Sequence, residues 1–207
     1  MEVKVFVNSV FNSNTYLLFK VDKDSVWIID PGSNFEQVEA WLKEKNKTIK
    51  GIMLTHTHFD HILGLNALMK SHPQVEVFAS VFAAQGLKSE KLNGSLYMEI
   101  PFVVENVDIV IVKQDDTIEL WEGLNATVFE TPGHDRDCVS YFIVDYLFSG
   151  DALIPGIKVH TKLKYSNKEK AKESIDGIRT NFNQKTIIYP GHGNACRLSE
   201  IDFAELL

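Results

Sequence analysis

The chain has 207 residues and a formal net charge of −7, from 21 basic and 28 acidic residues. This length suits one domain with a sizeable core, or at most two small ones, and since no linker divides the chain we expect residues 1–207 to form a single domain. No basic run predicts a nucleic-acid surface, and no apolar run reaches the ~18 residues of a membrane span. We therefore expect neither nucleic acid nor a membrane as a partner; the sequence does not predict an oligomeric state.

The cysteines and the first residues indicate the compartment. Cys138 and Cys196 are the two cysteines, and they form no C-x-x-C pair and imply no disulfide framework. Residues 1–7 alternate like a strand and lack the apolar core of a signal peptide. We therefore expect a reducing compartment and a cytoplasmic protein.

Strands followed by helices are predicted twice along the chain. In the first part the predicted strands cover 3–7, 15–19, 25–29, 49–54 and 75–79. The predicted helices there cover 34–45, with Asn34 as N-cap, 62–69 and 81–92. In the second part the predicted strands cover 125–130, 139–148 and 186–189, and the predicted helices cover 168–181 and 200–207.

The most informative stretch is Thr-His-Thr-His-Phe-Asp-His at 55–61, between a predicted strand and a predicted helix. Loops at strand ends commonly carry the sites of α/β folds. Imidazoles and carboxylates suit zinc and its first-row neighbours. Because the whole chain has seven histidines, a cluster of three favours a metal site over a merely solvated loop. The candidate ligands, in the pattern H-x-H-x-D-H, are His56, His58, Asp60 and His61.

One loop cannot close a two-metal site. His56 and His58 can converge on one ion while Asp60 and His61 turn towards a second, so further ligands must come from elsewhere. Three later loops each follow a predicted strand and place a glycine directly before a candidate ligand, which would let the backbone approach an ion closely. These three candidates are His134, Asp151 and His192.

With these residues the chain resembles the metallo-β-lactamase superfamily from about Asn14 to Gly193. The resemblance implies an α+β fold, a four-layer αβ/βα sandwich with two mixed sheets between helical layers. It assigns the first metal to His56, His58 and His134. It assigns the second to Asp60, His61 and His192, with Asp151 as the bridge between the two ions.

Asp30-Pro31-Gly32 matches a further element of that family. By the resemblance Asp30 would hydrogen-bond a ligand histidine from behind and fix its tautomer. The alternative is a plain Asp-Pro-Gly turn, and the sequence leaves the two readings open.

Such a site implies hydrolysis. Two divalent ions about 3.5–4 Å apart can share a hydroxide, and zinc lowers the pKa of bound water to about 7. We expect two divalent ions, zinc first, with iron or manganese as alternatives. Asp60 would ligate a metal and could accept a proton as the tetrahedral intermediate collapses. The reaction would be hydrolysis of an activated acyl or phosphoryl bond in a small molecule.

Within the superfamily the chain is most similar to the hydroxyacylglutathione hydrolase, or glyoxalase II, branch. Asp151 stands where some lactamase classes carry Cys or Ser, and His58 stands where flavodiiron proteins carry an acid. Only about fifteen residues follow His192, so we expect the helical region that binds glutathione in that branch to be missing. The leading prediction is a binuclear thioesterase that uses a metal-bridging hydroxide. The alternatives are a mononuclear iron enzyme similar to persulfide dioxygenases, with ligands matching His56, His134 and Asp151, and a non-catalytic metal-stabilised binding protein.

The chain departs from the family pattern after Pro-Gly-His. Thr, and Gly two residues further, are usual there, but this chain has Asp135, Arg136 and Asp137. We favour a solvated turn with Arg136 paired locally over contacts with ligands or substrate. Cys138 is predicted to be core. A later set of alternating basic residues suits either a substrate anion or the polar face of a strand: Lys158, His160, Lys162 and Lys164.

Overall fold

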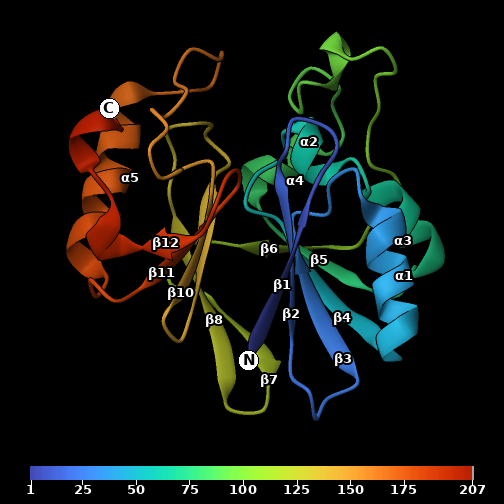
Figure 1. Ribbon diagram of the computed structural model, residues 1–207. Helices are drawn as coiled ribbons and strands as arrows, with labels where there is room; N and C mark the ends of the chain where they lie inside the picture. The colour runs from blue at the N-terminus through green and yellow to red at the C-terminus, as the bar shows by residue number, and fades with distance from the viewer. Residues whose placement is uncertain (207) are drawn as a thin grey trace. The chain divides into compact units, whose positions relative to one another are not determined.

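The computed structural model describes residues 1–206, which form two compact units, Met1–Ile111 and a second that begins at Val112. Each unit is built on one six-stranded mixed sheet with helices (Figure 1). The predicted α+β class with two mixed sheets is confirmed. The prediction of a single domain stays a prediction.

The first sheet has the order β1-β2-β3-β4-β5-β6. The first three strands form an antiparallel meander, and β3, β4 and β5 are parallel neighbours. The strands predicted from alternation and apolar runs begin and end within one residue of the observed strands in most cases. The strands are β1 Glu2–Val7, β2 Asn14–Phe19, β3 Ser25–Ile29, β4 Thr48–Met53, β5 Glu76–Ser80 and β6 Ile109–Val112.

Helices α1 Phe35–Lys45 and α3 Leu65–Ser71 cover one face of this sheet (Figure 1). Their apolar residues, spaced by three and four, pack on the strands. Three short helices complete the unit: α2 Phe59–Ile62, α4 Val81–Gly86 and the 3-10 turn η1 Ser95–Tyr97. Buried side chains, among them Leu42, Ile52 and Leu68, pack on the strands whose ends carry the first ligand group.

The second sheet has the order β12-β11-β10-β9-β8-β7, and β10 and β11 are its parallel pair. Helix α5 Lys168–Asn181 packs Ala171, Ile175 and Ile178 into a core with Leu147 and Ile188 of the sheet. Two 3-10 turns, η2 Leu198–Glu200 and η3 Phe203–Glu205, follow. The strands are β7 Thr117–Trp121, β8 Leu124–Glu130, β9 Val139–Ile143, β10 Tyr146–Gly150, β11 Ile187–Pro190 and β12 Cys196–Arg197.

Four predicted helices or strands have other bounds in the structure. The predicted helix over 62–69 is two helices, because Gly64 donates its N–H to the Pro31 carbonyl and lies so close to Gly32 that a Cβ would overlap that residue's oxygen. The predicted helix over 81–92 ends as α4 at Gly86. The predicted strand over 139–148 is a hairpin that turns at Val144, with φ 60°. The predicted terminal helix over 200–207 is only the 3-10 turn η3, and residue 207 lies outside the described part.

Asn34 precedes α1 as predicted, but its side chain does not cap the helix. The amide Nδ2 donates to the Val7 carbonyl at 2.7 Å, and Oδ1 accepts from the Ser9 N–H at 3.3 Å. Asn34 therefore ties the start of α1 to the loop between β1 and β2.

Candidate metal centre

The first ligand group lies where two parallel strands end. Asp30 directly follows β3 and the histidine loop follows β4, and Ile29 is in register with Met53. Since parallel neighbours bring their carboxyl ends to one edge of a sheet, residues 25 and 31 positions apart in the chain meet there. This edge positions Asp30 beside the H-x-H-x-D-H stretch.

Asp30 is 1% exposed and holds the histidine loop through both carboxylate oxygens. Oδ1 accepts from the Thr55 N–H at 2.8 Å, and Oδ2 accepts from the Thr55 hydroxyl at 2.6 Å. Oδ2 also lies 3.1 Å from Nδ1 of His61. A carboxylate can only accept, so Nδ1 of His61 carries the proton and Nε2 carries the lone pair that a metal would bind. Of the two readings left open for Asp30, this geometry supports the one in which it orients a histidine.

The other members of the first group are gathered on the same loop and on α2. His56 and His61 are fully buried, with ring centroids 4.2 Å apart, and the ring of His58 lies 4.8 Å from that of His56. Nδ1 of His56 lies 3.1 Å from the Thr55 hydroxyl. Nε2 of His61 lies 3.5 Å from Oδ2 of Asp60. The candidates from the first part of the chain thus form one local cluster.

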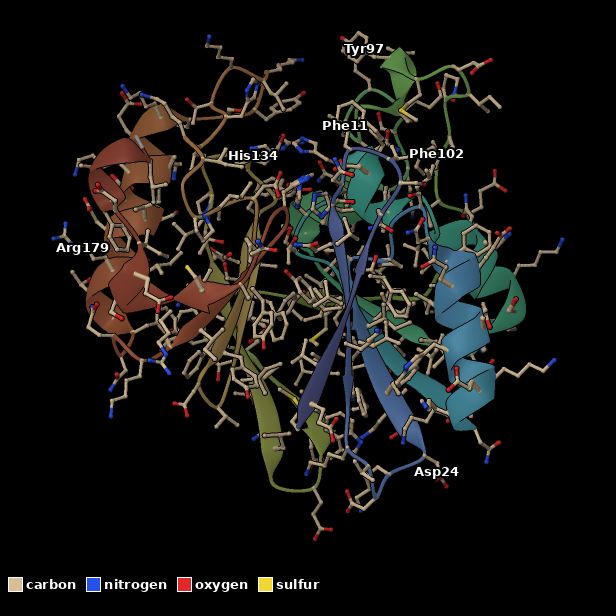
Figure 2. All side chains as sticks on the ribbon, viewed as in Figure 1. Phe11, Asp24, Tyr97, Phe102, His134 and Arg179 are labelled. Atoms are coloured by element: carbon tan, nitrogen blue, oxygen red, sulfur yellow. The ribbon has the colours of Figure 1, made fainter. Side chains whose placement is uncertain are left out.

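The second ligand group also lies where parallel strands end, in the second sheet. Asp151 follows β10 and His192 follows β11, which are parallel neighbours, and the Gly191 N–H donates to the Gly150 carbonyl at 2.8 Å. His134, labelled in Figure 2, follows β8, which runs in the direction of β10 because both are antiparallel to β9. The three candidates from the second part of the chain therefore converge at one edge.

Each of the two histidines is spaced from Asp151 like a pair of ligands that share an ion. Nε2 of His134 and Nε2 of His192 each lie 3.5 Å from the same oxygen, Oδ2 of Asp151. This spacing is long for a hydrogen bond. Ligand atoms 2.0–2.1 Å from a tetrahedral zinc are about 3.4 Å apart, so the observed spacing fits two ligands of one ion. The Asp60–His61 spacing fits equally well, and the donor set suits zinc or a first-row neighbour.

His134 is held from behind by the segment that follows Asp151. Its Nδ1 lies 3.1 Å from the His160 carbonyl oxygen, and its own carbonyl accepts from the Ser166 hydroxyl at 2.6 Å. The His160 contact fixes the tautomer that leaves Nε2 for a metal. His160, one of the alternating basic residues of the sequence, thus supports His134 through its backbone.

Gly133 packs directly against the backbone of α5. Its φ is 145°, and a Cβ there would overlap backbone atoms of Ala171 in α5. The glycine before His134 therefore permits the close approach of α5. The same helix is tied to this turn by the Ser174 hydroxyl, which donates to the Pro132 carbonyl at 2.7 Å.

The residues after His134 do not form the expected solvated turn. Asp135 and Asp137 are 8% and 6% exposed. Arg136 lies over the ring of Tyr165, which belongs to a different loop, 4.2 Å from its centroid. The local pairing of Arg136 stays a prediction. Cys138 is buried as predicted, and burial raises the pKa of its thiol well above the ordinary value, with the negative charges of Asp137, Asp135 and Asp151 adding to the effect.

The alternating lysines after Asp151 do not lie on a strand. Residues 158–164, all described, form an irregular loop, and Lys158, Lys162 and Lys164 are exposed. The strand-face reading is therefore wrong. The sequence did not predict the supporting contacts of Thr55 with Asp30 or of Ser166 with the His134 carbonyl, since a threonine and a serine carry no metal-ligand pattern.

Comparison with known proteins agrees with this geometry. The family model described as the metallo-beta-lactamase superfamily matches residues 8–192. The chain belongs to this superfamily. The fully described part of the chain holds no helix long and apolar enough to cross a membrane.

Several relatives and one solved structure are similar over much of the chain. A probable metallo-hydrolase of Streptococcus pyogenes serotype M6 is 33% identical over 201 residues, 93% of this chain and 84% of the relative. A hydroxyacylglutathione hydrolase of Buchnera aphidicola is 33% identical over 148 residues, 72% of this chain but 50% of the relative. The crystal structure of the B3 metallo-beta-lactamase BLEG-1 superposes with a TM-score of 0.88 at 27% identity, over 96% of this chain and 95% of that one.

Proposed function

We propose that this member of the superfamily is a binuclear metal-dependent hydrolase of thioesters, similar to glyoxalase II. His56, His58 and His134 would hold one ion, Asp60, His61 and His192 the other, and Asp151 would bridge them. We propose zinc as the metal, with iron or manganese as alternatives.

One observation carries the proposal: Nε2 of His134 and Nε2 of His192 each lie 3.5 Å from Oδ2 of Asp151. A carboxylate oxygen at ligand-to-ligand distance from both imidazoles is placed so that it could share one ion with His134 and another with His192. The hydrolase name of the Streptococcus relative supports hydrolysis, and the name of the Buchnera relative supports a thioester substrate.

The bound ions would supply an activated water and would polarise the acyl carbonyl. The chain's own residues have separate tasks. Asp30 keeps Nδ1 of His61 protonated, and the His160 carbonyl does the same for His134, so both rings present Nε2. Asp60 is 6% exposed, and we propose that its carboxylate takes the proton released during attack and delivers it to the leaving thiolate.

The proposal is tested by a substrate panel on protein loaded in turn with zinc, manganese and iron. The panel holds an acyl thioester, a lactone, a phosphodiester and a β-lactam. We expect kcat/KM to be highest for the thioester, with two metal ions per chain. Faster hydrolysis of the β-lactam or phosphodiester in every metal form would contradict the thioester assignment while leaving the hydrolase class intact.

We also propose a small molecule as the partner and a cytoplasmic location. The location is supported by Cys138 and Cys196, which are both free in the structure. A fluorescent fusion expressed in the source cell would test it.

A further inference from the structure

Three polar side chains of the first hairpin are buried together next to the histidine loop. Asn8 directly follows β1, Ser13 directly precedes β2, and Thr15 lies in β2. Their exposed fractions are 1%, 0% and 1%. Burying an amide and two hydroxyls costs free energy unless each group forms hydrogen bonds. The partners of these three groups therefore show what they stabilise.

The amide of Asn8 fixes the direction of the hydrogen bonds within this group. Its Oδ1 accepts from the Asn34 N–H at 2.9 Å, so the atom that faces the two hydroxyls is the nitrogen. Nδ2 donates one proton to Ser13 at 3.1 Å and the other to Thr15 at 3.0 Å. Because each hydroxyl accepts from Asn8, its own proton is directed to another acceptor.

The proton of the Thr15 hydroxyl goes to the backbone of Asp30. Oγ1 donates to the Asp30 carbonyl at 2.7 Å and also accepts from the Gly32 N–H at 2.9 Å. Asp30 has a φ of 51°, in the left-handed region that is costly for residues other than glycine. Its N–H donates to the Met53 carbonyl at 3.1 Å, so Thr15 holds the other side of the same strained residue. Since this backbone directs the Asp30 carboxylate to Thr55, the Thr15 hydroxyl acts on that carboxylate.

The proton of the Ser13 hydroxyl goes to the backbone of a candidate ligand. Oγ donates to the Asp60 carbonyl at 2.7 Å. In a longer α-helix that carbonyl would accept from the N–H of Gly64, four residues further on. Here the Gly64 N–H donates to the Pro31 carbonyl at 3.0 Å, so Ser13 supplies a donor where α2 ends.

The loop between β1 and β2 also contacts α2 through an aromatic pair (Figure 1). The ring of Phe11 in this loop meets the ring of Phe59 edge to face, with centroids 5.3 Å apart. Phe59 stands between His58 and Asp60 in the chain. Gly32 is close as well, since a Cβ there would lie 2.6 Å from the Asp60 carbonyl oxygen. The backbone of Asp60 is therefore packed and hydrogen-bonded by two other loops.

We propose that Ser13 and Thr15 are positioning residues of the metal centre. Their hydroxyls fix the backbone of Asp60 and of Asp30. They thereby set the direction of the carboxylate that would bind an ion and of the one that orients His61. The inference rests on the proposed metal assignment of Asp60 and His61 but not on the thioester substrate, and it extends the support of the ligands to the first hairpin.

The first measurement is the zinc affinity of the full chain, by competition with a coloured chelator. T15V replaces a hydroxyl by a methyl group and should raise the zinc dissociation constant about three- to tenfold, because Asp30 keeps its carboxylate but loses the bond that holds its backbone. T15S keeps the hydroxyl and should stay within about twofold of the parent protein. N66A is the matched control: Asn66 of α3 also bonds to a loop backbone, at 2.7 Å from the Val103 carbonyl outside the ligand loops, and its loss should change the affinity less than about twofold.

Amide hydrogen exchange in the same zinc-loaded protein then shows whether the effect is local. The N–H of Thr55 donates to Asp30 at 2.8 Å, whereas the N–H of Leu54, next to it in the chain, donates to a carbonyl of β5 at 2.9 Å. T15V should speed exchange at Thr55 at least about fivefold relative to Leu54, because the first of these bonds depends on Asp30. N66A should leave this exchange ratio unchanged.

S13A tests the contact with Asp60 separately. It removes the donor to the Asp60 carbonyl and should raise the zinc dissociation constant about threefold or more. The exchange ratio should stay within about twofold of that in the parent protein, since Thr15 still holds Asp30. Thermal unfolding shows whether each variant is folded, and S13A provides the test of the positioning role if T15V does not fold.

The outcomes separate this inference from the proposed function. Zinc affinities of T15V and S13A equal to that of N66A, with two ions bound, would overturn the positioning role and leave the binuclear proposal intact. Equal acceleration at both amides in T15V would overturn it too, because a general loss of stability would then explain the change. A parent protein that binds neither zinc, manganese nor iron would overturn the proposed metal centre. Selective acceleration at Thr55 in T15V would in that case still uphold the control of Asp30 by Thr15.

Discussion

Nδ1 of His61 lies 3.1 Å from Oδ2 of Asp30, and both side chains are almost completely buried. The same Oδ2 accepts the Thr55 hydroxyl, while Oδ1 accepts the Thr55 N–H. Asp30 therefore fixes the histidine ring and the first residue of its loop together. The pair links the end of β3 to the loop after β4, so the parallel pairing of these strands is what orients the ligand.

The first prediction concerns this pair. D30A should lower metal affinity by about 10–100-fold, because the ring of His61 loses the acceptor that fixes its tautomer. Competition with a coloured chelator measures the affinity. D22N, which removes an exposed charge before β3, should change it by less than about twofold. Equal affinities for D30A and the parent protein would show that Asp30 is only a turn residue.

The second prediction concerns Asp151. D151A should lower the metal content from about two ions per chain to one or fewer and should abolish measurable turnover, since the proposed bridge serves both ions. Elemental analysis after gel filtration measures the content. H72A is the control: His72 ends α3, its Nε2 contacts Glu39 at 2.9 Å, and its loss should leave two ions bound. A parent protein that never exceeds one ion under metal excess would contradict the binuclear proposal.

The sequence predicted what depends on local pattern. H-x-H-x-D-H between an apolar strand and a helix predicts a metal site, and glycine-ligand pairs after strands predict His134, Asp151 and His192 as its further ligands. The role of Asp30 stayed open, because Asp-Pro-Gly looks the same in a plain turn and in a ligand support. The difference lies in its contacts with Thr55 and His61, which the pairing of β3 with β4 creates.

Errors arose where a distant segment overrode a local preference. Asn34 has the ideal residue type for an N-cap, but its side chain bonds to the loop after β1 instead. Helical spacing continues through Gly64, yet the approach of Pro31 and Gly32 divides the helix there. Tyr165 had no pattern to mark it, since its contacts with Arg136 and Lys164 require the loop after β10 to lie beside the loop after β8.

The third prediction concerns Gly133. G133A should destabilise the protein by about 2–4 kcal/mol, because a strained φ and an overlap with α5 both add to the cost. Denaturant unfolding measures the loss. G123A separates the two effects: Gly123 also has a positive φ, of 73°, but open space around its Cβ position, so about 1 kcal/mol is expected. Equal losses in the two variants would show that the contact with α5 contributes nothing.

The fourth prediction concerns pH. If an ion activates water for attack, kcat/KM should rise with pH to a plateau with an apparent pKa near 7. The profile is measured between pH 5 and 9 with metal occupancy checked at each point, so that ligand protonation is not mistaken for the catalytic ionisation. A flat profile at constant occupancy would exclude this ionisation as rate-controlling.

The last prediction concerns Cys138. Burial and three nearby carboxylates raise the pKa of its thiol, so it should stay protonated and unreactive at pH 8, where Cys196, half-buried on β12, can be reached. A thiol reagent should therefore titrate at most one cysteine in the native protein and both in denaturant.

The raised pKa of Cys138 also predicts the direction in which the free energy of unfolding changes with pH. In the unfolded chain the thiol ionises near its ordinary pKa of about 8.5, while in the folded protein it does not. Above that pH the unfolded state binds fewer protons, so the contribution of Cys138 to the free energy of unfolding is complete below pH ~8.5 and declines as pH rises. C138A removes this group, so its stability should fall less than that of the parent protein between pH 8 and 10. Parallel stability curves for the two proteins, or rapid native labelling of both cysteines, would contradict a buried, neutral thiol beside the second ligand group.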